Sequence, residues 1–230
     1  MCTVTYVPIG DGVIVTSNRD EQPGRSAQAP AWHIYNNKKI AFPKEPRAGG
    51  SWFVADGAGN LAVLMNGGFE KHEWKPPYRK SRGLVLLDFF SDDDPAKHWQ
   101  NTCLDGIEPF TIVWFWQKNL YRLVWDGEEK HFEPLNPADA YIWSSAPLYG
   151  AGQRMNRAKL FADFTAESPP APDDLMRFHT RTGDEQDEGF VIERGFLRTV
   201  SITQAVIGPS EILVTHHDLV GGASYQFKAR

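Results

Sequence analysis

The chain has 230 residues, which is enough for one large domain with a continuous hydrophobic core and excludes a disulfide-stapled miniprotein. Hydrophobic residues make up 41% of the sequence and charged residues 23%, proportions typical of a folded globular protein and not of a disordered chain. The 24 Lys and Arg residues are outnumbered by 29 Asp and Glu, and the resulting net charge of −5 provides no general positive field for nucleic acid or anionic lipid.

The sequence predicts neither passage through a membrane nor secretion. The longest strongly apolar runs, at residues 84–87 and 110–116, are far shorter than the roughly 20 residues of a membrane-spanning helix. The residues after Met1 form neither a basic nor an apolar signal region. We therefore expect a cytoplasmic protein whose two cysteines, Cys2 and Cys103, are free thiols, and we expect Cys103 to be a buried helix residue.

The N-terminal quarter of the chain alternates in the way expected of β-hairpins. Residues 3–7 and 13–16 are β-branched and flank a Gly-Asp-Gly turn, so they predict a first hairpin that begins at the chain end. Residues 18–50 are rich in Arg, Pro, Gly, Asn and Lys and predict a long surface loop. Residues 51–55 and 61–65 flank a glycine-rich turn and predict a second hairpin.

Helices are expected mainly in the middle of the chain and strands at both ends. The remaining predicted elements are a loop at 66–80, a helix capped by Ser81 that runs to Phe90, a short helix from Pro95, a hairpin at 110–116 and 120–125, a strand at 141–144, helices at 155–164 and 173–178, a solvated loop at 180–193, and strands at 198–207, 211–215 and 224–228. Because helices and strands do not alternate one for one, we expect an α+β fold with mostly antiparallel sheets and a single domain over residues 1–230.

Cys2 is the residue that suggests chemistry. A small residue after the initiator Met1 generally permits removal of the methionine, and the new α-amino group then lies beside its own thiol. An α-amine with a pKa of about 8 can take the proton of a thiol with a pKa of about 8.5, so nucleophile and base are the same residue. The competing interpretation is that Cys2 is a small hydrophobic residue on an edge strand.

Three motifs follow Met1-Cys2 in a fixed order. They are Asn18-Arg19-Asp20-Glu21, Gly49-Gly50-Ser51-Trp52 and Ser81-Arg82-Gly83. In this order the sequence resembles the NRDE family, also called the transport and Golgi organisation protein 2 family, although Ser51 stands where Thr is usual. Weaker likeness at residues 61–66, 148–157 and 198–201 extends the resemblance over nearly the whole chain.

The resemblance implies an αββα four-layer sandwich of the N-terminal nucleophile hydrolase type. The site layout is similar to those of penicillin V acylases and bile salt hydrolases, which are cysteine amidases. It implies that Cys2 is the nucleophile and that Arg19 and Asp20 position the nucleophile and substrate. It further implies that Asn66 forms part of an oxyanion hole and that Arg198 assists from a distance.

Each of these residues also has a structural interpretation. The run at 19–21 can be a solvated charged turn, Asn66 can be a turn residue at a strand end, and Arg198 can be a surface residue of a strand. A second Asn that the wider amidase group uses in the middle of the chain is not evident here. Ser144-Ser145 occupies the corresponding place, and Ser145 is therefore a candidate substrate contact.

Two functions remain open at this point. The first is an N-terminal cysteine hydrolase that cleaves a non-peptide carbon–nitrogen bond without a cofactor. The second is a non-catalytic binding or trafficking protein for a lipid-like or tetrapyrrole-like small molecule, which the missing second Asn favours. In both cases the expected partner is a small molecule, and Trp52 and Trp74 are the candidate residues of its groove. No metal site is expected, because His216 and His217 alternate to opposite faces of a strand.

Overall fold

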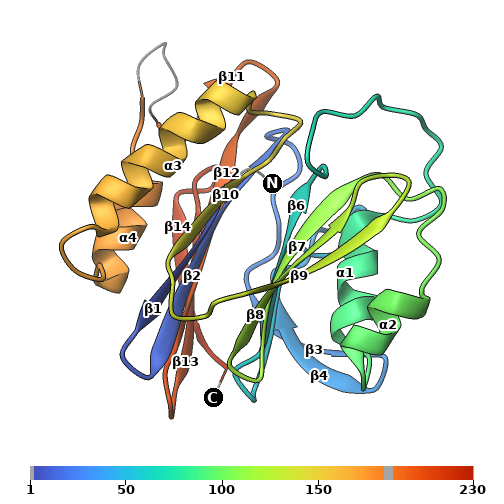
Figure 1. Ribbon diagram of the computed structural model, residues 1–230, viewed down its shortest axis with the longest axis horizontal. Helices are drawn as coiled ribbons and strands as arrows, with labels where there is room; N and C mark the ends of the chain where they lie inside the picture. The colour runs from blue at the N-terminus through green and yellow to red at the C-terminus, as the bar shows by residue number, and fades with distance from the viewer. Residues whose placement is uncertain (1–2, 184–188, 230) are drawn as a thin grey trace.

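Two antiparallel sheets face each other at the centre of the protein. The computed structural model describes residues 3–183 and 189–229. All strand pairs within the two sheets are antiparallel. Figure 1 shows the sheets edge-on with helices outside both of them, which is the predicted αββα arrangement.

The first sheet joins the two ends of the chain. Its strands are β1 (Thr3–Ile9), β2 (Gly12–Glu21), β10 (Tyr141–Ser144), β11 (Glu193–Arg194), β12 (Leu197–Ile207), β13 (Ile212–Asp218) and β14 (Ala223–Lys228). The order across the sheet is β10-β1-β2-β12-β13-β14, with β11 paired to β12. β2 therefore lies between β1, its neighbour along the chain, and β12, which follows it by almost 180 residues in the sequence.

The second sheet follows chain order. Its strands are β3 (Ala31–Tyr35), β4 (Lys38–Phe42), β5 (Phe53–Asp56), β6 (Leu61–Asn66), β7 (Phe110–Trp116), β8 (Asn119–Trp125) and β9 (Lys130–Leu135). Short turns connect β3 to β4, β5 to β6, β7 to β8 and β8 to β9, whereas residues 43–52 connect β4 to β5 and residues 67–109 connect β6 to β7. In the turn between β3 and β4, Asn36 and Asn37 both have positive φ, as a two-residue hairpin turn requires.

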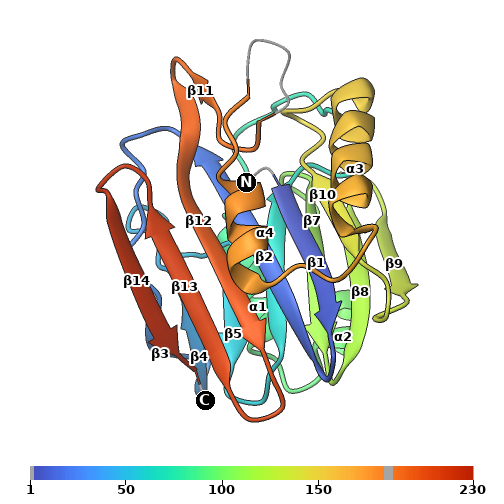
Figure 2. The same ribbon diagram turned by 90° about the vertical axis from the view of Figure 1, so that its left-hand side faces the viewer.

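Helices cover the outer face of each sheet. Helices α1 (Arg82–Phe90) and α2 (Pro95–Asn101) cover the second sheet, and helices α3 (Ala151–Thr165) and α4 (Pro172–His179) cover the first. Figure 2 shows α4 lying over β2 and β12, with α3 beside it near β10. Three hydrophobic clusters hold the layers together, one between the sheets and one under each helix pair.

The charged motif of β2 corrects one prediction. Residues Asn18, Arg19 and Asp20 were expected in a surface loop, yet they belong to β2 and are almost fully buried. The loop prediction for residues 18–50 also missed strands β3 and β4. Composition suggested a loop because charged side chains usually lie in solvent, whereas β12 supplies a partner strand for Asp20 and Arg19 through Thr199 and Ser201.

Two further predictions were wrong. Cys103 is not a buried helix residue: it follows the end of α2 and is exposed. The expected solvated loop at 180–193 contains Phe190, which is fully buried against α4. In that loop, residues 184–188 lie outside the described part of the chain.

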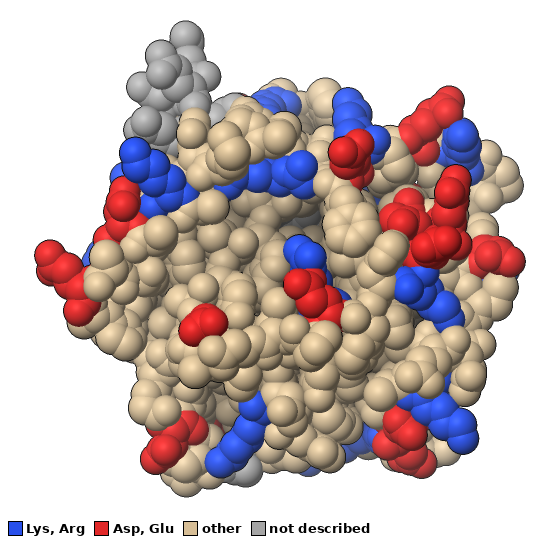
Figure 3. All heavy atoms as spheres, in the orientation of Figure 1, with Lys and Arg blue, Asp and Glu red and all other residues tan. Residues whose placement is uncertain are grey.

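Within residues 3–183 and 189–229, no helix combines the length and the apolar character needed to cross a membrane. On the face shown in Figure 3, described Lys and Arg side chains are interspersed with Asp and Glu and separated by wide uncharged areas.

Candidate functional site

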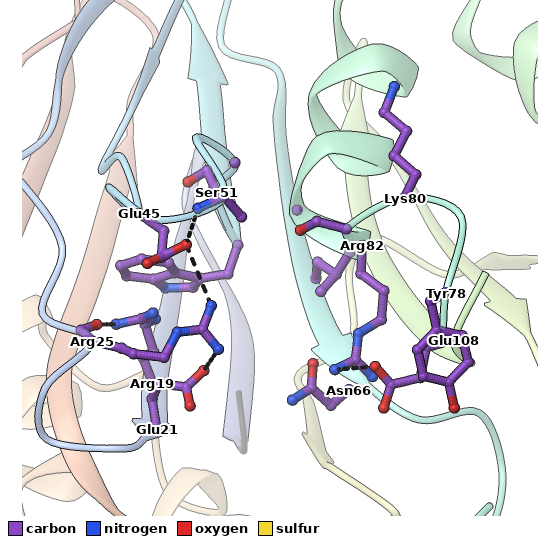
Figure 4. A pocket seen from close by; sticks show the side chains of 16 residues that line it. Arg19, Glu21, Arg25, Glu45, Ser51, Asn66, Tyr78, Lys80, Arg82 and Glu108 are labelled. Atoms are coloured by element: carbon purple, nitrogen blue, oxygen red, sulfur yellow. Dashed lines mark hydrogen bonds and ion pairs between the residues drawn. The ribbon is translucent and has the colours of Figure 1, made fainter. Parts of the chain in front are cut away.

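A cavity of about 350 Å³ lies between β2 on one side and β6 with the N-terminus of α1 on the other. Figure 4 shows Arg19, Glu21, Arg25 and Glu45 on one wall, facing Asn66, Arg82 and Glu108 on the opposite wall. All three sequence motifs reach this cavity. Arg19 and Glu21 come from the first motif, Gly50, Ser51 and Trp52 from the second, and Ser81, Arg82 and Gly83 from the third.

The alternation of β2 decides which side chains face the cavity. Val13 and Val15 pack between the sheets, whereas Ile14 packs under α3 and α4. The same alternation directs Arg19 between the sheets and Asp20 toward the helices, because successive residues of a strand point to opposite faces. The two central residues of the motif therefore serve different layers of the fold.

Arg19 is a buried cation in the cavity wall. Its guanidinium lies 4.5 Å from the centre of the Trp52 ring, a cation–π contact, and Nη1 donates a hydrogen bond of 2.5 Å to the carbonyl oxygen of Arg25. Only 4% of Arg19 and 3% of Trp52 is exposed. A cation held this rigidly favours a negative charge developing in the cavity.

Asp20 is held from the helix side of the first sheet. Its Oδ1 accepts a hydrogen bond of 2.5 Å from the Thr199 hydroxyl, and its Oδ2 accepts one of 3.2 Å from the Tyr149 hydroxyl. The Asp20 residue is 2% exposed and contributes only to the wall of a second cavity described below. Asp20 therefore ties β2 to β12 and to the segment before α3.

Asn66 is the last residue of β6 and lines the cavity opposite Arg19. Gly67, which has a positive φ of 83°, follows it and turns the chain sharply. The buried Ser145 hydroxyl donates a hydrogen bond of 2.9 Å to the Asn66 backbone carbonyl oxygen. Ser145 thus supports the backbone of Asn66 and does not line either cavity.

A cluster of ion pairs fixes the wall around Arg19. Arg25 bridges Glu21, at 2.9 Å, and Glu45, at 3.3 Å. Burial alone would raise the pKa of Glu45, but hydrogen bonds from the backbone N–H groups of Ala48 and Arg47 and the charge of Arg25 together lower it. Glu45 therefore stays ionised and secures the loop that carries Gly50 and Trp52.

A second cavity, of about 260 Å³, adjoins the first and shares Glu21, Asn66, Arg82 and Glu108 with it. Glu108 accepts from Arg82 at 3.0 Å and lies 3.2 Å from Nε2 of His72. The predicted groove residue Trp74 lines this second cavity and is 71% exposed, so it forms part of the rim.

Like Ser145, the predicted site residue Arg198 does not line these cavities. Arg198 pairs with Glu21 across the strands, but its Nη2 donates to the Leu219 carbonyl oxygen at 3.4 Å and its Nε lies 3.9 Å from Glu193. Cys2 lies outside the described residues; the next residue, Thr3, pairs with Asn18 of β2 and Ser144 of β10.

Several residues that line the first cavity were not predicted from the sequence as site residues. They are Glu21, Arg25, Glu45, Tyr78, Lys80, Arg82 and Glu108. Arg82 lies in a motif that was recognised only as a helix start, and treating residues 18–21 as a strand would have placed Glu21 beside Arg19. Glu45 and Glu108 carry no signal in the sequence, because isolated glutamates are usually solvated.

The chemistry of the cavities rests on fixed charges and amide donors. Among the described residues, no group of three His, Cys, Asp or Glu side chains is placed to hold a metal ion. The walls offer the Arg19 guanidinium, the Asn66 carboxamide and the Glu108 carboxylate with its basic neighbours. Such groups can orient a polar substrate and stabilise an oxyanion.

Solved structures share this architecture. An N-acylethanolamine-hydrolyzing acid amidase ortholog from Caenorhabditis elegans is 8% identical, with a TM-score of 0.59 over 88% of this chain and 92% of that chain. A variant of the conjugated bile acid hydrolase from Clostridium perfringens is 11% identical, with a TM-score of 0.53 over 100% of this chain and 97% of that one. At these identities the likeness concerns the fold, which is that of the N-terminal nucleophile hydrolases, as predicted.

Sequence comparison gives the family. No curated protein matches the chain significantly. The family model "Transport and Golgi organisation 2" matches residues 1–182, which include all three motifs and both walls of the cavity. The chain therefore belongs to the Transport and Golgi organisation 2 family.

Proposed function

We propose that the protein is a cytoplasmic N-terminal cysteine hydrolase that cleaves a non-peptide amide bond in a small molecule. Cys2 is the nucleophile, and its own α-amine is the base once Met1 has been removed. The observation that carries the proposal is that Arg19 and Asn66 line one cavity from opposite walls. Thr3, the neighbour of Cys2, pairs with Asn18, the neighbour of Arg19, which supports a position for Cys2 near this cavity.

The proposed reaction has two stages, acylation of the Cys2 thiol and hydrolysis of the resulting thioester. The α-amine of Cys2 takes the thiol proton, and the thiolate attacks the amide carbonyl. The Asn66 side-chain N–H receives the oxyanion, and Arg19 stabilises the thiolate by its charge. Collapse breaks the carbon–nitrogen bond, and the α-ammonium gives its proton to the leaving amine. Water then attacks the thioester, with the α-amine again as base. The carbon–sulfur bond breaks, the carboxylic acid is released, and the α-ammonium returns the proton to the Cys2 sulfur.

The test begins with the chain terminus. Intact mass spectrometry of the protein from cells should show loss of Met1, and a panel of small amides should contain compounds that the wild type hydrolyses. Cys2→Ser should abolish turnover, whereas Cys103→Ser, which changes the exposed second thiol, should retain it. An unprocessed Met1, or equal turnover by wild type and Cys2→Ser, would contradict the proposal.

Asn66 provides a second arm of the same test. Because one oxyanion donor contributes roughly 3 kcal/mol, Asn66→Ala should lower kcat by about 10²-fold with little change in KM. Thr102→Ala, a substitution outside both cavities, is the matched control. A variant with normal kcat would remove Asn66 from the proposed oxyanion hole.

A binding protein is the second candidate function, and one contact favours it. Ser145 stands where the amidases have a second Asn, and its hydroxyl already donates to the Asn66 backbone, so this position adds no donor to the cavity. A lipid-like or tetrapyrrole-like ligand would then co-purify with the protein. Mass spectrometry of ligands from wild type and Trp74→Ala distinguishes the two functions, since a hydrolase releases its product and a carrier retains its cargo.

A further inference from the structure

Arg157 is a buried cation that the proposed reaction does not use. It lies on α3, and only 1% of the residue is exposed. Within the described part of the chain it forms no ion pair; its two hydrogen bonds go to neutral oxygens. Nη1 donates to the Thr3 hydroxyl at 2.6 Å, and Nη2 donates to the Gly189 carbonyl at 2.5 Å. A buried charge with only neutral partners is costly, which points to a role other than stability.

Two aromatic rings enclose the guanidinium. Its central carbon lies 3.8 Å from the centre of the Tyr149 ring and 4.8 Å from that of Phe190. The charge acts on its surroundings, because burial and the nearby Arg157 charge lower the pKa of His179 to about 3. His179, which shares a hydrogen bond with the Thr5 hydroxyl, is therefore neutral. The positive charge next to the first residues of β1 is that of Arg157.

Tyr149 connects this cation to the charged motif of β2. The face of its ring lies against Arg157, and its hydroxyl donates to Asp20, which also accepts from Thr199. Thr3 and Asp20 are thus fixed by neighbouring groups on the helix side of the first sheet. Arg19 lies on the opposite side, facing the cavity.

We propose that Arg157 is a positioning residue that fixes Thr3, and through Thr3 the chain terminus, relative to Arg19. The inference rests on the proposed function in one respect, namely that Cys2 is the reacting residue. Among the described residues, the hydroxyl of Thr3 is the one side-chain atom of β1 to which Arg157 donates a hydrogen bond. Its removal should therefore release the terminus while leaving the paired strand intact.

Thr3→Val tests this with a substitution of the same shape and the same preference for strands. Thr3→Ser keeps the hydroxyl and is the matched rescue variant. All variants carry Cys103→Ser, so that iodoacetamide reports on Cys2 alone. Thr3→Val should slow alkylation of Cys2 and reduce kcat by about tenfold with unchanged KM, and Thr3→Ser should stay near wild type.

Arg157→Met should give the same loss, Arg157→Lys should restore part of it, and Lys159→Met on the exposed side of α3 should have no effect. The double variant Thr3→Val/Arg157→Met should be no worse than Arg157→Met alone, because both substitutions remove the same hydrogen bond between Arg157 and Thr3. If Arg157→Met fails to fold, Thr3→Val still decides the matter. Wild-type alkylation in folded Thr3→Val overturns the inference. If alkylation of Cys2 changes as expected in the variants but the wild type hydrolyses no amide, only the proposed function is overturned.

Discussion

The Ser145 hydroxyl donates a hydrogen bond to the backbone carbonyl oxygen of Asn66, 79 residues earlier in the chain. This contact joins the segment after β10, in the first sheet, to the end of β6, in the second. The site therefore depends on how the two sheets are held together as well as on its own side chains.

Ser145→Ala should reduce the free energy of unfolding by about 1 kcal/mol, because a mostly buried carbonyl loses its donor. Urea denaturation measures the change, and Ser168→Ala, at an exposed position after α3, serves as the control. If Ser145→Ala unfolds at the wild-type urea concentration, the hydrogen bond does not stabilise the contact between the sheets.

Glu45→Gln should destabilise the protein in a pH-dependent way. The pKa of Glu45 is lowered in the folded state from its ordinary 4.5, so the carboxylate stabilises the fold above that pH, and this contribution is lost as the pH falls through the lowered pKa. At pH 7 we expect a loss of about 1–3 kcal/mol, which shrinks below pH 4.5. Urea denaturation at pH 7 and at a pH below 4.5, with the exposed Glu128→Gln as control, checks this. An equal loss at the two pH values would show that the stabilisation does not come from the ionised carboxylate.

Acid should destabilise the protein through two buried histidines. Burial, together with the charge of Arg157, lowers the pKa of His179 from 6.5 to about 3. Burial also lowers the pKa of His216 to about 4, although the charge of Asp218 acts in the opposite direction. Below pH 6.5 the unfolded chain binds protons that the folded protein excludes, so stability falls as the pH drops toward 4.

Each histidine contributes up to about 1.4 kcal/mol per pH unit in that window. His179→Gln should be less stable than wild type at pH 7, because it loses hydrogen bonds to Asn18 and Thr5, yet it should lose less stability on acidification. Equilibrium unfolding at several pH values gives both slopes. Parallel slopes for wild type and variant would show that folding does not lower the pKa of His179.

Cys103 should react with thiol reagents in the native protein, because it is exposed. Its replacement by Ser should change the free energy of unfolding by less than about 0.5 kcal/mol, as is usual for surface substitutions. Mass spectrometry after brief iodoacetamide treatment, combined with urea denaturation, tests both statements. A Cys103 that reacts only after unfolding would mean that this position is covered in solution.

Local patterns predicted the elements whose stabilising contacts are close in the sequence. The hairpin of β7 and β8 follows from alternation and the helix after Ser81 from its apolar spacing, and both were predicted almost to the residue. Ser81 occupies the N-cap position as expected, but its side chain makes no capping hydrogen bond. The cavity was harder to foresee. Its wall at Arg19 requires β12, which contributes Ser201 from the other end of the chain, and no local pattern reports such a pairing.

Burial of polar residues was the other limit. Asp20 is buried because hydroxyl donors from separate segments satisfy it, and Arg157 is buried although its hydrogen-bond partners are neutral, whereas composition alone assigns charged side chains to the surface. The turn at Asn36-Asn37 did carry a usable hairpin signal, and with it β3 and β4 could have been found inside the expected loop. The resemblance to a family supplied Arg19 and Asn66, which the residues by themselves left open.

The opposite orientations of Arg19 and Asp20 make the order of the two residues as important as their identity. Exchanging them would place a carboxylate against the Trp52 ring and a guanidinium against the donating hydroxyls of Thr199 and Tyr149. Inserting or deleting one residue within β2 would do the same by shifting the strand. A motif of the same composition can thus place its charges on the opposite faces of the sheet. A search for relatives of this site must therefore match strand register and not merely residue content.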